Sequence, residues 1–343
     1  MDFSHLDLNL IWFVLVGALL TGYAILDGFD LGVGMLHLLA KTDQERRLML
    51  NSIGPVWDGN EVWLVTGGGA LFAAFPNVYA TLTSGLYPVI MLLLTALIFR
   101  AIAIEFRSKQ PMRWWRQLWD VSFFAASLVA TFIFGIALGN LVWGLPLDAN
   151  GEFVGSVWDL FNPYTLLVGL TIVALFMMHG AIYLVMKTEG AFHDKVRGWI
   201  GNTIIFFIIC FFLVTMATLV YFPHMTEKLR IHPELFIIPF LTTMAIANIP
   251  REIHHGRDFQ AFLSSCATIV LMMLLFGGGL YPNIVLSHPI EANSLTIYNA
   301  ASSSKSLNYM LNIALIGMPF VLSYTIGIYW IFRGKVRITK ESY

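Results

Sequence analysis

Residues 8–36 read LNLIWFVLVGALLTGYAILDGFDLGVGML, and this stretch decides the fold of the chain. An α-helix needs about 20 predominantly apolar residues to cross the hydrocarbon core of a bilayer, and the stretch is longer than that. It lacks the basic leader and the small-residue cleavage site of a secretory signal peptide, whose apolar region is about 7–15 residues long. We therefore expect it to remain in the protein as a first membrane-spanning helix.

Further apolar runs follow along the chain, which is 57% hydrophobic and only 12% charged. Soluble domains carry about 25% charged residues, so the composition predicts an all-α polytopic membrane protein with a single transmembrane domain over residues 1–343. The nine predicted spans lie near 8–36, 52–75, 77–104, 117–144, 162–187, 199–222, 234–250, 260–282 and 308–332. The first four and the next four could form two four-helix bundles, with the ninth as an extra helix. The seventh is short, and Asn248 and Pro250 interrupt its inner end.

Lysine and arginine are distributed unevenly between the two sides of this predicted bundle. Nine spans place the termini on opposite sides, and cytoplasmic segments collect Lys and Arg. The odd-numbered connections and the C-terminal tail, which includes Lys340, hold all of the 20 basic residues except Lys228, Arg230 and Lys305. The N-terminus is therefore predicted outside and the C-terminus in the cytoplasm.

Composition and motifs exclude several function classes. The net charge is −1 and there is no basic stripe, which argues against nucleic-acid binding. Cys210 and Cys266 lie far apart in apolar runs and form no metal-binding or redox motif, so no metal site is predicted. His179 is the only histidine well inside a span, so the chain does not visibly carry its own bis-imidazole haem site. Its cofactor-binding residues stay unassigned.

Five carboxyl groups lie inside or at the edge of the apolar runs, namely Asp27, Asp30, Asp58, Glu61 and Glu105. A charge at the centre of a membrane helix costs about 2.5–3.5 kcal/mol or more, so each must face protein or water. Asp27 and Asp30 are three residues apart and share a helix face, and Asp58 and Glu61 repeat this spacing about two turns into the second span. If the two spans pack as an antiparallel hairpin, these four acids form a polar track from the cytoplasm toward mid-membrane.

A proton path is the natural use of such a track. Low-dielectric surroundings favour the protonated form of a carboxyl group, and a neighbouring carboxylate favours it further, so the group can hold and pass a proton. Trp57 and Asn60 could donate hydrogen bonds along the track. Arg100 and Glu105, near the inner end of the third span, could support it.

Structural roles for these acids remain open. Asp27 and Asp30 could lie at the inner headgroup level, or they could form structural ion pairs with Arg100 or Arg107. Glu105 equally fits a paired surface charge at a basic edge. Asp58 lies between apolar and aromatic residues in a glycine-containing segment, which favours a functional role.

A series of motifs runs in order through the chain, most densely in its first half. It comprises DGFDLGVG at 27–34, ERR at 45–47, NSIGPVWDGNEVWL at 51–64, GGALFAAFP at 68–76, FR at 99–100, EFRSK at 105–109, WD at 119–120, GN at 139–140 and NAASS at 299–303. The series closely resembles subunit II of the cytochrome bd-type ubiquinol oxidases. The later half matches mainly in hydropathy.

The resemblance implies a bacterial inner-membrane complex in which a subunit I of homologous fold holds the quinol site and haem b558, haem b595 and haem d. Such a complex oxidises quinol at the outer face and reduces dioxygen to water with cytoplasmic protons, which builds a membrane potential without pumping. In the family, the aspartate matching Asp58 is assigned to a proton route toward the haem subunit. Membrane lipid, a structural quinone in subunit II and a small single-helix accessory subunit are further expectations from the resemblance.

The leading hypothesis is thus an oxidase subunit that supplies a proton path and stabilises its partner. A proton-coupled secondary transporter would also use intramembrane acids, but it predicts discontinuous helices and related halves. A purely structural scaffold for subunit I is the remaining alternative.

Overall fold

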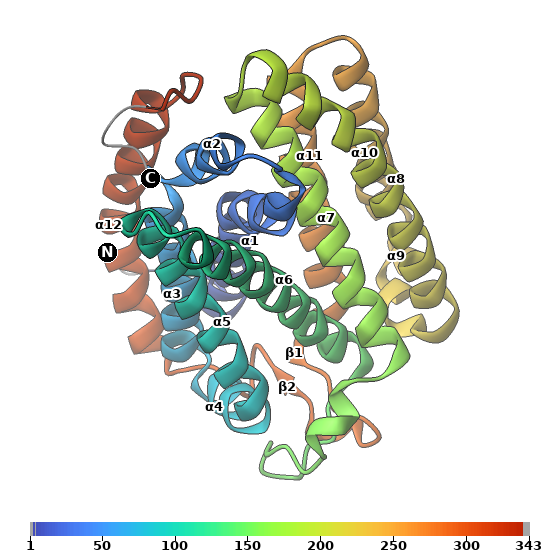
Figure 1. Ribbon diagram of the computed structural model, residues 1–343. Coiled ribbons are helices and arrows are strands. Elements are labelled where there is room, and N and C mark those ends of the chain that lie inside the picture. The colour runs from blue at the N-terminus through green and yellow to red at the C-terminus, as the bar shows by residue number, and fades with distance from the viewer. Residues whose placement is uncertain (1–2, 4, 339–343) are drawn as a thin grey trace.

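The computed structural model describes residues 3 and 5–338, so Lys340 lies outside the described residues. The described chain is a bundle of long helices (Figure 1). These are α1 (Leu8–Leu36), α3 (Trp57–Ala74), α5 (Tyr87–Phe106), α6 (Arg113–Trp143), α7 (Pro163–Lys187), α8 (Gly190–Tyr221), α10 (Ile237–His254), α11 (Asp258–Leu280) and α12 (Ser304–Ile331). Within the described residues, eight helices are long and apolar enough to cross a membrane, or nine if a bent pair counts as one span. The predicted all-α polytopic membrane fold is confirmed.

Short elements connect the long helices. They are α2 (Asp43–Ile53), α4 (Pro76–Gly85), α9 (Glu227–Ile231) and the antiparallel strands β1 (Asn283–Val285) and β2 (Leu295–Thr296). The helix α4 forms the bent pair with α3, at an angle of 119°. In the strand pair, Asn283 lies opposite Thr296 and Val285 lies opposite Leu295.

Helix boundaries differ from the sequence prediction at three places. The second predicted span joins two elements, because α2 ends at Ile53 and α3 begins only at Trp57. The third predicted span joins α4 to α5, each of which carries a proline in its first turn, where its missing N–H costs nothing. The seventh span is not broken, since α10 continues through Pro250 to His254.

Capping groups explain several helix ends. The Asp7 carboxylate accepts hydrogen bonds from the backbone N–H groups of Asn9 and Leu10, which begins α1. Thr42 and Glu45 form a reciprocal capping box at the start of α2. Gly144 ends α6 in a left-handed conformation with φ of 91°, which glycine adopts without a steric penalty.

The helix α7 lies at the centre of the bundle, where it packs against α1, α6, α8 and α11. Its approach to α1 is very close, because a Cβ atom on Gly32 would lie 1.9 Å from the Phe176 carbonyl oxygen. The two predicted four-helix units therefore share a seam along α7. The ninth span, α12, packs at the edge against α1 and α3 (Figure 1), and only Leu307 and Leu311 of its residues are buried.

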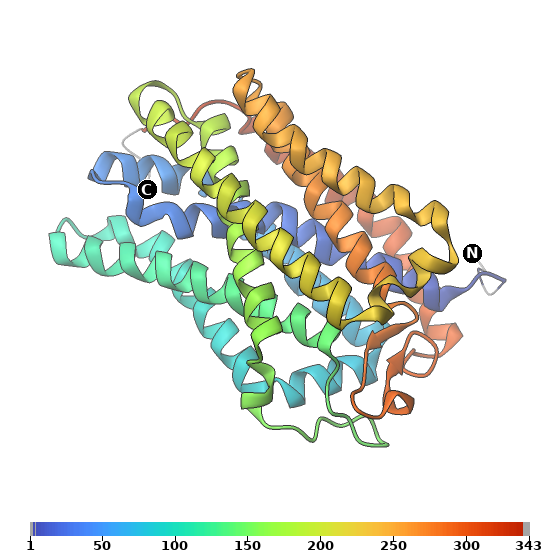
Figure 2. The same cartoon turned by 90° about the vertical axis from the view of Figure 1, so that its right-hand side faces the viewer.

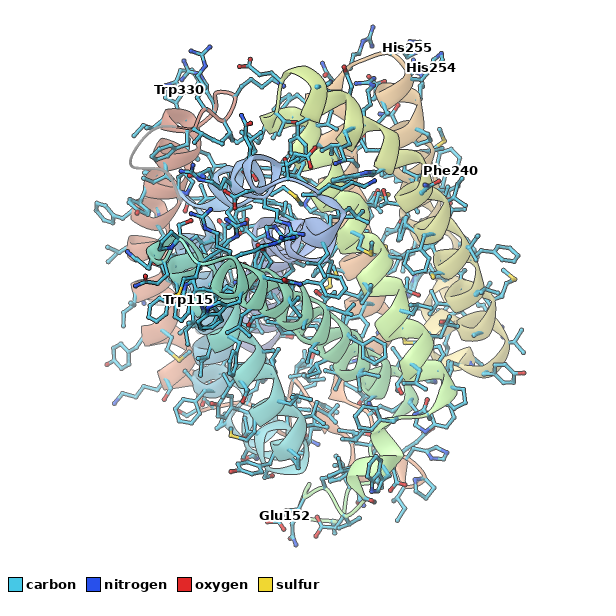
Figure 3. All side chains as sticks on the ribbon, in the orientation of Figure 1. Trp115, Glu152, Phe240, His254, His255 and Trp330 are labelled. Atoms are coloured by element: carbon cyan, nitrogen blue, oxygen red, sulfur yellow. The ribbon has the colours of Figure 1, made fainter. Side chains whose placement is uncertain are left out.

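The two ends of the bundle are easily recognised. The N-terminus and the C-terminus lie at opposite ends (Figure 2). Glu152, in the loop between α6 and α7, lies at one end, whereas His254, His255 and Trp330 lie at the other (Figure 3). Below, the end that carries α2 and the last residues of α12 is called the C-terminal end of the bundle.

Candidate functional site

A buried ion-pair cluster links α1, α3 and α5. Arg100 Nη1 donates hydrogen bonds to both carboxylate oxygens of Asp27, each at 2.8 Å, and Arg100 Nη2 donates to Glu61 Oε2 at 3.2 Å. Asp27 and Arg100 are fully buried, while the Glu61 side chain keeps 23% of its surface exposed. Glu61 therefore connects the buried pair to the surface of the chain.

A second arm of this cluster runs from Asp30 through Asn60 to α12. Asn60 Nδ2 donates to Asp30 Oδ2 at 2.8 Å and to the Leu26 carbonyl oxygen at 3.1 Å. The Tyr329 hydroxyl donates to Asn60 Oδ1 at 2.8 Å. Sequence reasoning did not identify Tyr329, because a lone tyrosine near the end of a span ordinarily belongs to the interfacial aromatic belt.

The cluster holds more acid than base. One guanidinium faces the carboxyl groups of Asp27, Asp30 and Glu61 at a buried site. Unpaired charges cost much free energy in such surroundings. The cluster, with three carboxyl groups and one guanidinium, can approach neutrality only by binding protons. Its composition is suited to holding and releasing protons.

Asp58 lies elsewhere than the sequence predicted. Because α3 begins at Trp57, Asp58 is in the first helical turn rather than about two turns into a span. Its side chain is exposed, and it stands one turn before Glu61 on the same helix. An acid in the first turn is also stabilised by the helix macrodipole, which is a structural role that needs no proton path.

The two supporting residues Trp57 and Glu105 contribute less directly. Trp57 is half-buried and packs against the main apolar core. Glu105 is half-buried near the end of α5, five residues beyond Arg100 and thus roughly 7 Å further along the helix.

Apolar side chains of α2 extend the main apolar core at the C-terminal end of the bundle. Met49, Leu50 and Ile53 are fully buried and belong to the same apolar core as Met35 and Leu36 of α1. The helix itself is fastened by Glu45, which accepts hydrogen bonds from Lys195 Nζ and the Lys41 backbone N–H. Burial alone would raise the pKa of Glu45, but these partners outweigh it and lower the pKa below its usual value.

A second ion cluster, centred on Asp120, was not predicted. Asp120 Oδ1 lies 2.6 Å from His37 Nε2 and accepts from Arg107 Nε at 2.5 Å, and Asp120 Oδ2 accepts from Arg46 Nη1 at 2.7 Å. Arg107 also donates to Asp43 of α2 at 2.9 Å. Arg107 thus pairs with these acids and not with Asp27 or Asp30. The dipeptide Trp119-Asp120 within α6 was the one available signal, as an acid beside an apolar run.

His179 links three helices. Its Nδ1 lies 2.7 Å from Ser265 Oγ of α11 and its Nε2 lies 3.0 Å from the Ile25 carbonyl oxygen of α1. The ring stacks on Phe262 with centroids 5.0 Å apart. Both nitrogens are engaged within the protein, so this imidazole does not fit the role of a haem ligand.

A largely apolar cavity of about 400 Å³ lies between α1, α6, α7, α8 and α11. Its wall includes Tyr23, Leu138, Thr171, Phe211 and Met272. Its size and apolar lining are typical of a site for a hydrophobic small molecule.

The fold and the two ion clusters define a polytopic helical membrane protein with ionisable groups inside its bundle. Comparison with known proteins then gives the family. The model of the family "Cytochrome bd terminal oxidase subunit II" matches residues 8–332, so the chain belongs to this family and is a subunit of a terminal oxidase. The resemblance seen in the sequence is confirmed.

Individual relatives match nearly the whole chain. The cytochrome bd-I ubiquinol oxidase subunit 2 of Escherichia coli (strain K12) is 36% identical over 97% of this chain and 96% of its own length. The cytochrome bd ubiquinol oxidase subunit 2 of Bacillus subtilis (strain 168) is 36% identical over 96% of this chain and 97% of its own. A chain of the bd oxidase structure from Geobacillus thermodenitrificans has the same fold, with a TM-score of 0.79 at 16% identity, over 95% of this chain and 99% of that one.

Proposed function

We propose that this chain works in a bacterial quinol oxidase that reduces dioxygen to water, beside a subunit I that carries haem b558, haem b595, haem d and the quinol site. The names of the relatives, which are ubiquinol oxidase subunits, support this role. The engaged nitrogens of His179 agree with haem binding in the partner. A secondary transporter is not favoured, because the relatives are oxidase subunits.

The chain's own contribution is a proton path that begins at Asp58. Asp58 is exposed in the first turn of α3, Glu61 follows one turn deeper, and Glu61 shares Arg100 with buried Asp27. The path runs along the surface of α3, because Asp58 is exposed there and the Glu61 side chain keeps 23% of its surface exposed. The partly exposed Glu61, bonded to a buried ion pair, is the observation that carries the proposal.

Subunit I covers the side of the bundle formed by α3 and α12, on the left of Figure 1. Gly59 is exposed next to Asp58 and Gly69 is exposed about three turns further along α3, and small residues let a neighbouring membrane helix approach closely. An exposed carboxylate cannot face acyl chains cheaply, so a protein or water-lined surface must meet Asp58. Such a partner completes the proton path and is stabilised by the same contact.

The complex lies in the bacterial inner membrane with the N-terminus outside and the C-terminus in the cytoplasm. The bias of lysine and arginine supports this orientation. Asp58 then faces the cytoplasmic side, from which protons are taken. The resulting separation of protons from quinol oxidation at the outer face builds a membrane potential without pumping.

Substitution of Asp58 by Asn tests the proton path. We expect oxidase turnover of the purified complex to fall by about tenfold or more, with haem content unchanged, since a positioned proton-transfer group typically contributes 10²–10⁴-fold. The matched control is Glu152→Gln, which neutralises an acid at the opposite end of the bundle (Figure 3). Normal turnover of the Asp58→Asn complex with full haem content would leave this subunit only a scaffolding role.

A structural quinone fits the apolar cavity between α1, α6, α7, α8 and α11. The cavity offers about 400 Å³ and an apolar wall for an isoprenoid tail. Ala24→Phe narrows the cavity, whereas Ala18→Phe adds the same ring on an exposed face of α1. Quinone extracted per complex falls only in the first variant; equal amounts in both would exclude this site. The single-helix accessory subunit and specific lipid stay predictions.

A further inference from the structure

Few residues of α12 are buried against the rest of the bundle, and Tyr329 makes its polar contact with the ion-pair cluster. The buried residues of α12, Leu307 and Leu311, both lie near the helix start. At the other end, Tyr329 packs its ring edge-on to Phe29, with centroids 6.5 Å apart, and donates its hydroxyl proton to Asn60 Oδ1. The hydrogen bond from Tyr329 to Asn60 thus links the ion-pair cluster to α12, a helix at the edge of the bundle.

The orientation of the Asn60 carboxamide follows from its neighbours. The Leu26 carbonyl oxygen can only accept a hydrogen bond, so the amide nitrogen of Asn60 must face it. The amide oxygen therefore faces Tyr329, whose hydroxyl must be the donor. With the amide nitrogen fixed in this way, its second hydrogen points to Asp30 Oδ2 at 2.8 Å.

This geometry distinguishes the two oxygens of Asp30. Oδ2 is occupied as an acceptor whether or not the carboxyl group carries a proton. Oδ1 is buried and has no hydrogen-bond partner among the described residues. A proton taken up by Asp30 therefore resides on Oδ1.

We propose that Tyr329 is a positioning residue for proton uptake at Asp30, acting through the Asn60 carboxamide. The inference rests on the proton path proposed above and adds Asp30 and α12 to it. Tyr329 donates its hydrogen bond to Asn60 and not to a carboxylate. It holds the Asn60 carboxamide so that the amide nitrogen donates to Asp30 Oδ2 and leaves Asp30 Oδ1 free to receive a proton. Movement of α12 against α3 would change how strongly Asp30 retains that proton.

The ionisable groups around this site come from every neighbouring helix. They are Asp27 of α1, Glu61 of α3, Arg100 of α5, Tyr183 of α7, Cys266 of α11 and Tyr329 of α12. The Arg100 guanidinium donates its hydrogen bonds to Asp27 and Glu61. Asp30 instead accepts its hydrogen bond from the Asn60 amide.

Tyr329→Phe tests the inference because it removes the hydroxyl and keeps the ring. A hydrogen bond from the Asn60 amide favours the ionised form of the Asp30 carboxyl group over the neutral form. Loss of this hydrogen bond should therefore move the pH of half-maximal turnover upward by about half to one unit. The infrared carboxyl band that disappears in Asp30→Asn should shift in frequency in the Tyr329→Phe complex.

The matched control is Tyr183→Phe, which removes another buried hydroxyl next to Phe29. The Tyr183 ring stacks on Phe29 at 3.9 Å, and its hydroxyl donates to the Ser52 carbonyl oxygen. We expect this variant to lose stability but to keep the wild-type pH profile and infrared band.

Three outcomes are distinguishable. A shifted profile and band in Tyr329→Phe alone support the inference. A wild-type profile and band in Tyr329→Phe, with turnover impaired in Asp58→Asn, overturn the positioning role and leave the proton path standing. Unchanged turnover in both Asp58→Asn and Asp30→Asn overturns the path and the inference together.

Discussion

Removal of the Arg100 guanidinium is the sharpest test of the buried cluster. Arg100→Met keeps most of the apolar stem but deletes both hydrogen bonds to Asp27 and the one to Glu61. Glu61 can turn toward its exposed side, since 23% of its side chain already meets the surface. Asp27 is fully buried and must either stay charged without a cation or bind a proton.

The magnitude of the destabilisation is set by whichever state of Asp27 costs less free energy, the unpaired charge or the protonated carboxyl group. A carboxyl group with the ordinary aspartate pKa of about 3.9 costs roughly 4 kcal/mol to protonate at pH 7, and about 1.5 kcal/mol at pH 5. Loss of one partner from a buried ion pair typically costs 3–5 kcal/mol, in agreement with the first value. The unfolded state binds the fewer protons here, so the destabilisation of the variant shrinks as pH falls, by about 1.4 kcal/mol per unit.

SDS-induced unfolding of the purified complex in mixed micelles, followed by tryptophan fluorescence at pH 5 to 8, measures these differences. The double variant Arg100→Met with Asp27→Leu should recover most of the loss, because a buried ion pair can be replaced by apolar residues at little cost. Arg116→Met is the control, since the ion pair of Arg116 with Asp43 is partly exposed to solvent and should contribute less than about 1 kcal/mol.

A destabilisation of Arg100→Met that does not change between pH 5 and 8 would refute this reasoning. So would a double variant that is as unstable as the single one. Either result would mean that Asp27 is not left as an uncompensated buried charge when the guanidinium is removed.

Two further predictions concern packing and the second ion cluster. Gly32→Ala places a methyl group against the Phe176 carbonyl oxygen and should cost about 3 kcal/mol in the same unfolding assay, whereas Gly17→Ala on the same helix meets no atom within 4 Å and should change stability by less than about 1 kcal/mol. Equal effects of the two would disprove the close α1–α7 contact. Asp120→Asn leaves Arg46 and Arg107 without their shared carboxylate and should speed amide hydrogen exchange in α2 but not in α7. Unaltered exchange in α2 would show that Asp120 does not hold it.

The spans could be predicted from the sequence because hydropathy reports directly on burial in lipid. The errors lie where apolar residues do not continue one helix. Ile53 belongs to α2, whose apolar side packs on the core, and the sequence alone cannot separate it from the run that follows Pro55. The break between α4 and α5 was readable, since Pro76 and Pro88 are both helix-start signals.

The acids could be named from the sequence, but the sequence could not decide which partner each acid takes. Arg100 was one of two cations considered for Asp27, and only the tertiary structure, which places the Arg100 guanidinium 2.8 Å from the Asp27 carboxylate, decides between them. Tyr329 and Asn60 are 269 residues apart, and no local pattern links them. Asp58 was placed too deep for the same reason that α2 was missed, since both depend on where α3 begins.

The exposed position of Asp58 also bears on how the complex is made. A newly inserted copy of this chain presents a carboxylate on an apolar helix face, with Val62, Val65 and Phe72 exposed along the same helix. If subunit I meets this face, as proposed above, free energy favours association with it over a carboxylate that faces the bilayer. The exposed carboxylate thus gives an unassembled copy of this chain a chemical feature that a copy in contact with a partner at α3 would lack.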